Sequence, residues 1–583
     1  MLHTLSRSLR ENKGPALVTV LLSALEVVFE IVIPLFMSNL IDFGIEGGSM
    51  AAVWKFGAFL LLLAVFQLAT GVLAARIAAR ASVGFAANLR EDMYNNVQTF
   101  AFSNIDKFST ASIVTRLTTD TTNVQNAFQM LMRMAIRAPV MLVFSMIVSF
   151  RISHDISMTF LIILPILALA LFFIIRSVFP VFSRVFRTYD ELNNVVQENV
   201  RGIRVVKSFN QERHEIGKFG AISERIYKDF SKGERLITLN APLMQFCIYT
   251  CMIVISWLGA KAIIASGNDP ALGLTTGNLT ALITYTMQIL SSLMMLSMVF
   301  AMLTISLSSA RRIAEVLEER SDIPQPEQPV MTVRDGAVDF DHVSFVYASK
   351  ADKKVLDDID LHIRSGETIG IIGGTGASKS SLVQLIPRLY DVTGGKLTLG
   401  GVDVRDYDLD TLRGAVAMVL QKNELFSGTI AENLRWGNEN ATDEQLRRAC
   451  ELACADGFIS AMPDGYDTHI EQGGTNVSGG QKQRLCIARA LLKKPKVLIL
   501  DDSTSAVDTR TDAQIQQALS TYIPDTTKII IAQRISSVQN ADRIVVLDDG
   551  RIDAVGSHDE LLRTCEIYRE VYESQQKGGE DDA

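Results

Sequence analysis

Two adjacent carboxylates, Asp501 and Asp502, follow an apolar run in the segment "LILDDSTSAVD" at residues 498–508. A buried strand that ends in an acid commonly presents that acid to a divalent metal ion, and a neighbouring carboxylate can then act on a water molecule. Asp502 is one methylene shorter than Glu, so its carboxylate has a shorter reach. We therefore expect metal-assisted hydrolysis here, at a rate that depends on the reach of Asp502.

A glycine-rich loop at residues 373–380 could hold phosphates for that reaction. Its sequence, "GGTGASKS", fits G-x-x-x-x-[G]-K-[ST], a loop whose backbone N–H groups surround phosphates. In this pattern Lys379 reaches the β- and γ-phosphates, and the Ser380 hydroxyl is a Mg²⁺ ligand. Ser378 stands where the pattern has Gly, which allows the closest backbone approach, so we expect weaker nucleotide binding. The predicted nucleotide-binding residues of this region are Gly373, Gly374, Thr375, Gly376, Ala377, Ser378, Lys379, Ser380 and Ser381.

The residues around the loop predict the elements that position it. "VDFDHVSFVY" alternates like a strand, "ETIGIIG" is a strand that leads into the loop and a helix, and "KVLILDD" is a second buried strand. This pattern favours an α/β P-loop nucleotide-binding domain at residues 336–575. Residues 316–335 are polar and proline-containing, which is typical of a linker. Residues 576–583, "QKGGEDDA", are predicted to form a disordered tail.

Six apolar stretches dominate the first half of the chain. Each could cross a bilayer as a helix, which takes about 20 residues, and only helices satisfy their own backbone in lipid. Residues 1–315 are therefore predicted to form a transmembrane domain with six helices and two long cytoplasmic loops. Lys and Arg gather before the first stretch and after the second, fourth and sixth, which predicts cytoplasmic termini. The stretches lie near residues 15–43, 53–79, 130–151, 156–179, 239–265 and 279–306.

Two features inside the apolar stretches could contact a transported molecule. Glu26 and Glu30 lie at positions i and i+4 of the first stretch and share a helix face. Carboxylates at membrane depth face a cavity or a partner charge, so the pair is either a site for a cation or proton or a structural pair. Met294 and Met298 belong to a methionine stripe in the last stretch, which either adapts to varied apolar ligands or packs against other helices.

Charge and cysteine content exclude other classes of protein. The 583-residue chain has a net charge of −8, so it has no overall basic field for nucleic acid. Its 6 cysteines form no C-x-x-C pair or Cys/His cluster, so neither a zinc site nor a disulfide framework is predicted.

Taken together, these motifs resemble those of ATP-binding cassette (ABC) exporter half-transporters, which fuse six membrane helices to one nucleotide-binding domain. The resemblance covers nearly the whole chain, and its most specific part is "NVSGGQKQR" at residues 476–484, which resembles the family signature. Tyr347 resembles the aromatic residue that stacks on adenine, and Asp508 lies in a segment that resembles the D-loop. The resemblance implies ATP and Mg²⁺ as cofactors. It implies that the γ-phosphate is contacted by Ser478, Gly479, Gly480 and Gln481. It also implies that Mg²⁺ is bound by Ser380, Gln421 and Asp501.

Two residues at the reacting centre depart from the family pattern. Where the family has a catalytic Glu this chain has Asp502, and Gln533 in "IIIAQRISS" replaces the switch histidine. Gln cannot carry positive charge toward the transferring phosphate, and misplacing a reacting group by about 1 Å can cost ~10²-fold in rate. With Ser378, these departures resemble the degenerate ATP site of one subunit of bacterial heterodimeric multidrug-type exporters. The intact signature would then complete the partner's competent site.

The resemblance implies a second ABC half-transporter chain as partner, a lipid environment, and a small-molecule, lipid or peptide substrate that is transported at the expense of ATP. Two alternatives remain: a homodimeric exporter that hydrolyses ATP slowly through Asp502, and an ATP-gated channel or regulator. The compact half-transporter architecture favours a bacterial plasma membrane.

Overall fold

The computed structural model describes residues 1–270, 273–347, 354–374 and 376–580. It divides into two compact units: unit 1 comprises Met1–Gln98 and Thr110–Glu319, and unit 2 comprises Thr99–Ser109 and Arg320–Ala583. The expected fold class, six long apolar helices followed by an α/β domain, is confirmed in the described residues.

The described residues of unit 1 form helices joined by turns and short loops, without a strand. Six of its helical segments in the described residues are long and apolar enough to cross a membrane. Its elements are α1 (Leu2–Arg7), η1 (Arg10–Asn12), α2 (Lys13–Asn39), η2 (Leu40–Glu46), α3 (Met50–Gln98), α5 (Thr110–Thr115), η3 (Arg116–Asp120), α6 (Thr121–Ile152), α7 (His154–Arg201), α8 (Ile203–Ser208), α9 (Glu212–Thr238), α10 (Asn240–Ser266) and α11 (Thr276–Glu318).

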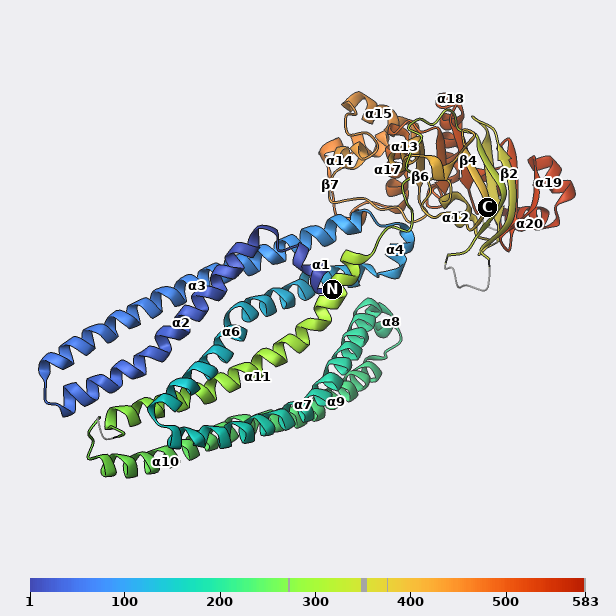
Figure 1. Cartoon of the computed structure of the whole chain (residues 1–583). Helices are drawn as coiled ribbons and strands as arrows, with labels where there is room; N and C mark the ends of the chain where they lie inside the picture. The colour runs from blue at the N-terminus through green and yellow to red at the C-terminus, as the bar shows by residue number, and fades with distance from the viewer. Residues whose placement is uncertain (271–272, 348–353, 375, 581–583) are drawn as a thin grey trace. The chain divides into compact units, whose positions relative to one another are not determined.

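Small residues allow the long helices of unit 1 to pack closely. Helix α2 lies alongside α3, α6 alongside α11, and α7 alongside α9 and α10 (Figure 1). Ala74, Ala78 and Ala81 of α3 are fully buried at helical spacing, and Ala78 and Ala81 pack with Met132 of α6. Without a hydrophobic driving force in lipid, such close backbone approach supplies much of the attraction between helices.

Helices α3 and α7 are much longer than a bilayer is thick. They contain 49 and 48 residues, and at ~1.5 Å per residue each is more than twice the ~30 Å hydrocarbon core. The polar halves of these helices therefore extend into the aqueous phase.

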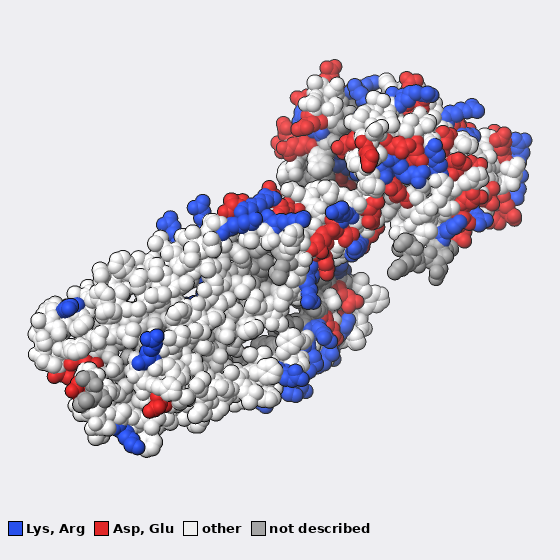
Figure 2. All heavy atoms as spheres, viewed as in Figure 1, with Lys and Arg blue, Asp and Glu red and all other residues white. Residues whose placement is uncertain are grey.

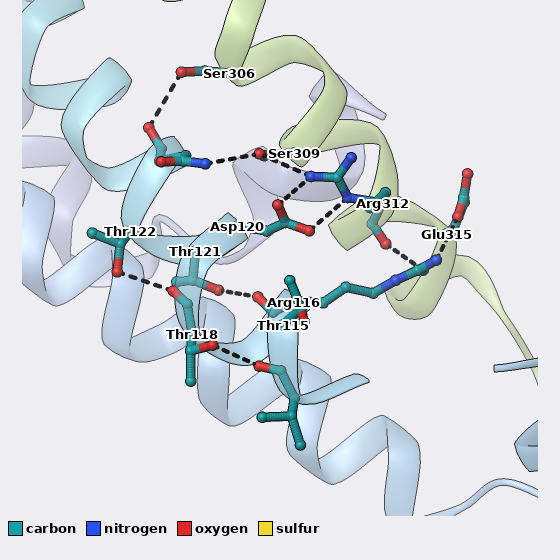
Figure 3. Close-up of polar contacts among 12 residues, drawn as sticks. Thr115, Arg116, Thr118, Asp120, Thr121, Thr122, Ser306, Ser309, Arg312 and Glu315 are labelled. Carbon is teal, nitrogen blue, oxygen red and sulfur yellow. Dashed lines mark hydrogen bonds and ion pairs between the residues drawn. The ribbon is translucent and has the colours of Figure 1, made fainter. Parts of the chain in front are cut away.

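A polar cluster joins the start of α6 to the end of α11 (Figure 3). The π-helical turn η3 presents Asp120, which is 1% exposed, to Arg312, whose Nε donates to Asp120 Oδ2 at 2.7 Å. On the same turn, Arg116 Nη1 donates to the backbone oxygen of Arg312 at 2.7 Å, and its Nη2 lies 3.0 Å from Glu315 Oε2. Because Arg312 and Glu315 occupy the last two turns of α11, this cluster fixes the helix just before the chain leaves unit 1.

Unit 2 is built on a six-stranded sheet in the order β12-β11-β3-β10-β9-β6, in which only the β11–β12 pair is antiparallel. All five residues of β9 are buried, as its continuous apolar sequence predicts for a central parallel strand. The strands are β3 (Thr368–Gly373), β6 (Val416–Val419), β9 (Val497–Asp501), β10 (Thr527–Ile531), β11 (Arg543–Asp548) and β12 (Arg551–Gly556).

A second, antiparallel sheet has the order β2-β1-β4-β5, and the apolar residues between the two sheets form one core. Its strands are β1 (Val338–Phe345), β2 (Leu356–Ile363), β4 (Gly394–Leu399) and β5 (Val402–Asp403), and a separate pair joins β7 (Gly428–Thr429) to β8 (His469–Ile470).

Helices and short turns complete unit 2. They are α4 (Phe102–Lys107), α12 (Lys379–Gln384), η4 (Val404–Asp406), α13 (Leu409–Ala415), α14 (Ile430–Arg435), α15 (Asp443–Leu452), α16 (Asp456–Ser460), η5 (Gly465–Asp467), η6 (Gln472–Gly474), α17 (Gly479–Leu492), α18 (Thr509–Tyr522), η7 (Ile535–Ser537), α19 (His558–Thr564) and α20 (Glu566–Glu580).

Unit 2 ends in a helix that runs into the segment for which the sequence predicts a disordered tail, residues 576–583. Helix α20 continues to Glu580, while residues 581–583 lie outside the described residues. The helix is held by Tyr568, which is fully buried, and by Val571 and Tyr572, which pack against the same core.

Candidate functional site

Four adjacent parallel strands bring the predicted residues to one edge of the main sheet. The glycine-rich loop begins at the end of β3, Asp501 ends β9, Gln421 follows β6 by two residues, and Gln533 follows β10 by two residues. Because parallel strands share one carboxyl edge, residues far apart in the sequence meet there, which is the usual place for ligand binding in such sheets.

Backbone geometry explains two positions of the glycine-rich loop. A Cβ on Gly373 would lie 2.2 Å from the backbone oxygen of Leu547, so no other residue fits there. Ser378 has φ +66°, a left-handed conformation that favours glycine, at the position where the sequence departs from the pattern. Lys379 Nζ donates to the backbone oxygens of Gly373 and Gly374, each at 2.8 Å.

The rest of the loop has an equally tight backbone. Gly376 has φ +88°, and the buried Ala377 donates its N–H to the Gly374 oxygen at 3.2 Å. Thr375, predicted to bind nucleotide, lies outside the described residues.

Asp501 is a buried carboxylate, 3% exposed, at the end of β9. Burial raises its pKa, whereas a hydrogen bond from the Ser380 hydroxyl and the charge of Lys379 favour its ionised form. Burial likewise lowers the pKa of Lys379, against the attraction of Asp501 and Asp502. In the described residues no group of three His, Cys, Asp or Glu could hold a metal. One carboxylate with a hydroxyl nonetheless suits Mg²⁺, which takes its other ligands from phosphates and water.

Asp502 is held by two amides. Gln533 Nε2 donates to Asp502 Oδ2 at 2.8 Å, and Gln421 Nε2 lies 3.4 Å from the same oxygen. Burial raises the pKa of Asp502, and the two amides oppose that shift. Its φ of +48° marks a sharp turn directly after β9. The three side chains therefore form one polar group beside Asp501.

Gln575 of α20 is a further member of the site that the sequence analysis missed. Its Nε2 donates to the backbone oxygen of Gln533 at 2.7 Å, and its Oε1 accepts from the Ile535 N–H at 2.9 Å. The C-terminal helix thus fixes the turn that carries Gln533. Nothing in the sequence around Gln575 indicates this contact, because it depends on how α20 packs.

Tyr347, predicted to stack on adenine, lies beside the loop. Its hydroxyl is 2.7 Å from the Ser381 hydroxyl, and its ring meets that of Tyr390 edge-on at a centroid distance of 5.1 Å. Tyr390 in turn donates to Asp106 Oδ2 at 2.8 Å and packs against Phe102 of α4. The sequence analysis did not single out Tyr390, although it connects α4 to the nucleotide-binding edge.

The signature residues lie at the start of α17, on an exposed surface. Ser478 caps the helix by accepting from the Gln481 N–H at 3.3 Å, and the Ser478 N–H donates to Gln481 Oε1 at 2.9 Å. A Cβ on Gly480 would lie 2.7 Å from the Ala506 oxygen, so glycine lets this helix pack on the segment after β9. Gly479 and Ser478 are exposed, and the first turn of the 14-residue helix points N–H groups outward.

Asp508 acts as a helix cap in this structure. Its Oδ1 accepts from the Thr511 N–H at 2.9 Å, and this backbone hydrogen bond lowers the pKa of Asp508. The side chain is therefore engaged with its own helix, α18.

In unit 1, Glu26 and Glu30 share one cation, Arg137 of α6. Arg137 Nη1 donates to Glu26 Oε1 at 2.8 Å, and its Nη2 donates to Glu30 Oε2 at 2.7 Å. Gly71 of α3 allows close approach, since a Cβ there would lie 3.3 Å from Glu26 Oε1. The structural alternative raised by the sequence, a pair facing another helix, therefore has a specific partner, which the sequence analysis did not identify.

Met294 and Met298 occupy exposed positions one turn apart on α11, at 44% and 62% exposure. Their exposure leaves both free to contact lipid, a partner helix or a transported molecule.

Comparisons with known proteins agree with this architecture. Residues 16–294 match the model of the ABC transporter transmembrane region, and residues 356–505 match the ABC transporter model. The uncharacterized ABC transporter ATP-binding protein YfiB of Bacillus subtilis is 35% identical over 558 residues, covering 96% of each chain. A Mycobacterium tuberculosis relative, also an uncharacterized ABC transporter ATP-binding protein, is 33% identical over 99% of this chain and 98% of its own. The solved structure of a bacterial Atm1-family ABC exporter with ATP bound has the same fold, with a TM-score of 0.81 at 24% identity over 97% of this chain and 98% of that one.

Proposed function

This chain belongs to the ABC transporter family, and we propose that it is one half of a heterodimeric exporter in which its own ATP site binds nucleotide but hydrolyses it slowly. It is a multi-pass membrane protein with an ABC ATPase domain. The proposal concerns what its two ATP sites do, which partner completes them, and the outward direction of transport.

The observation that carries the proposal is the pairing of Asp502 with Gln533. In ATP hydrolysis, an acid must orient the attacking water while a donor stabilises the charge that develops on the transferring phosphate. Here the short acid accepts a hydrogen bond from Gln533 at 2.8 Å. This hydrogen bond engages the acid and the amide with each other, and Gln533 has no positive charge to offer.

The remaining groups of the site are suited to holding nucleotide. Lys379 and the loop backbone would contact the phosphates, and Asp501, Ser380 and Gln421 would face Mg²⁺. Bound Mg²⁺ would neutralise charge on the β- and γ-phosphate oxygens. Nucleotide held in this way would act as a stable bridge to the partner while the partner's site turns over.

The signature of this chain would complete the partner's site. Ser478 and Gly479 are exposed at the start of α17, where N–H groups and the helix dipole attract phosphate oxygens. ABC half-transporters work as dimers, so a second chain with Glu and His at the positions of Asp502 and Gln533 would supply the competent site.

The proposed substrate class is supported by two features of unit 1. Two acids, Glu26 and Glu30, share the single cation Arg137, and Met294 with Met298 adds an adaptable apolar surface. These features favour a cationic amphipathic molecule, transported across a bacterial plasma membrane.

Co-purification with the product of a neighbouring half-transporter gene tests the proposal. We expect the two-chain complex to hydrolyse ATP in lipid nanodiscs. The hydrolysis rate should fall at least tenfold when Ser478→Arg blocks the signature of this chain. The matched variant Lys379→Ala, which alters the chain's own site, should reduce the rate much less. Equal loss in both variants would contradict the division of labour between the two sites.

A further inference from the structure

Two hollows lie end to end along helix α7, and their linings differ in chemistry. The first has a volume of 630 Å³ and is lined by Phe172, Ile175, Arg176, Phe179 and Pro180. The second has a volume of 480 Å³ and is lined by Arg184, Arg187 and Thr188 of α7 together with Arg225, Lys228 and Asp229 of α9. Neither hollow belongs to the ATP site or to the Glu26 cluster.

The α7 residues of both hollows form one continuous stripe. From Phe172 to Thr188 they recur every three or four positions, which places them on one helix face. The apolar part, from Phe172 to Pro180, rises about 12 Å, close to the ~15 Å depth of the hydrocarbon in one leaflet. Its aromatic side chains are exposed, Phe172 at 58% and Phe179 at 56%.

The second hollow has an excess of positive charge. Its lining carries four cations and one carboxylate, Asp229. Arg184 lies 3.5 Å from Asp229, Arg225 lies 2.7 Å from Glu191, and the exposed Lys228 lies 3.4 Å from Glu224. Among the described side chains, three acids therefore face four cations, and Arg176 in the lining of the first hollow adds a fifth cation. In the part of the chain that the structure describes, neither Arg176 nor Arg187 forms an ion pair.

The order of the spans places the basic hollow on the same side of the membrane as the C-terminal end of α11. Helices α7 and α11 are the fourth and sixth spans, so both run in the same direction and end on the same side. Figure 2 shows Lys and Arg gathered over the α7 and α9 end of unit 1, next to the uncharged surface of the spans. An apolar groove thus enters the leaflet, and a basic hollow lies at its polar end.

We propose that this stripe, from Phe172 to Thr188 with Arg225 and Lys228, binds an anionic phospholipid of the adjacent leaflet. An acyl chain would lie against Phe172, Ile175 and Phe179. The headgroup phosphate would accept hydrogen bonds from Arg184 and Arg187, which suit phosphate because guanidinium groups donate in a planar fork. Inorganic phosphate shares the chemistry of the headgroup but has no apolar part that could contact the groove. The joined hollows therefore favour a lipid.

Native mass spectrometry of the full-length chain in detergent tests this site. The chain is titrated separately with phosphatidylglycerol, phosphatidylcholine and inorganic phosphate. We expect phosphatidylglycerol to bind at least fivefold more tightly than phosphatidylcholine, and inorganic phosphate at equal concentration not to displace it. Arg184→Ala with Arg187→Ala should remove this preference, whereas the matched pair Arg201→Ala with Arg204→Ala, also exposed and basic, should retain it.

A second pair of variants separates the lipid from a soluble anion. Phe172→Ala with Phe179→Ala should weaken phosphatidylglycerol binding several-fold while leaving ATP binding intact, which also shows that the variant is folded. Equal affinity for the two lipids, displacement by inorganic phosphate, or no effect of the Arg184 and Arg187 changes would each overturn the proposal.

Discussion

Gln533 Nε2 donates a hydrogen bond to Asp502 Oδ2 at 2.8 Å, so the two residues that we propose to stand in place of a catalytic acid and a switch histidine are bound to each other. Gln421 approaches the same carboxylate oxygen at 3.4 Å. Both amides therefore engage one oxygen, Oδ2, of the Asp502 carboxylate. This arrangement supports the slow hydrolysis that we propose for this site.

The left-handed backbone of Ser378 predicts that Ser378→Gly will tighten nucleotide binding. A non-glycine residue in this conformation costs roughly 1–2 kcal/mol, and glycine removes that strain from the phosphate loop. We expect ATP affinity to rise several-fold and the unfolding temperature to increase by a few degrees. Ser378→Ala is the control, because alanine retains the strain. A gain in affinity with alanine equal to that with glycine would show that backbone conformation is not the cause.

The burial of Asp501 predicts a pH-dependent stability. Because its pKa is raised in the folded chain, the native state keeps a proton between pH 3.8 and that raised value, where the unfolded chain has lost it. Stability therefore falls as pH rises through this window. Asp501→Asn should flatten this part of the pH profile in thermal unfolding without Mg²⁺, and it should abolish the stabilisation that Mg²⁺ adds to ATP. An unchanged profile would show that Asp501 is not the group responsible.

The ion pair between Asp120 and Arg312 predicts that Asp120→Asn will destabilise unit 1. Breaking a buried pair costs about 3–5 kcal/mol. Since the Arg312 side chain is 44% exposed and screened by solvent, we expect a smaller loss of about 2 kcal/mol. Thermal unfolding measures this loss, with Thr118→Ala on the exposed side of the same turn as control. Equal effects of the two substitutions would contradict a specific role for the pair.

Arg137 links two acids in the membrane domain, so Arg137→Gln should be more harmful than removing one acid. The substitution leaves Glu26 and Glu30 near each other without a counter-charge, which costs several kcal/mol at membrane depth. Glu30→Gln keeps the Arg137–Glu26 pair, and we expect this variant to fold but to transport cationic amphipathic dyes poorly. The measurement is dye uptake into inside-out vesicles that contain the Glu30→Gln chain together with its partner chain. Unimpaired uptake would exclude a role of Glu30 in substrate binding.

The local sequence predicted the strands and loops of the ATP site better than it predicted the side-chain contacts between distant segments. The buried run before Asp501 and the glycine-rich loop before Lys379 identify strand ends, and parallel pairing necessarily brings such ends together. The contacts of Gln575 with Gln533, and of Arg137 with two glutamates, depend on helix packing between segments far apart in the chain. No local pattern encodes such packing.

The hydrolysis rate of the purified chain, alone in lipid nanodiscs, tests the central claim most directly. We expect negligible turnover by the unmodified chain and a gain of about 10²-fold in the double variant Asp502→Glu with Gln533→His, which restores the reach of the acid and a chargeable donor. Asp502→Asn with Gln533→His serves as the matched control and should stay inactive. Robust turnover by the unmodified chain, lost in Asp502→Ala, would contradict the account and establish a homodimeric pump in which the short carboxylate suffices.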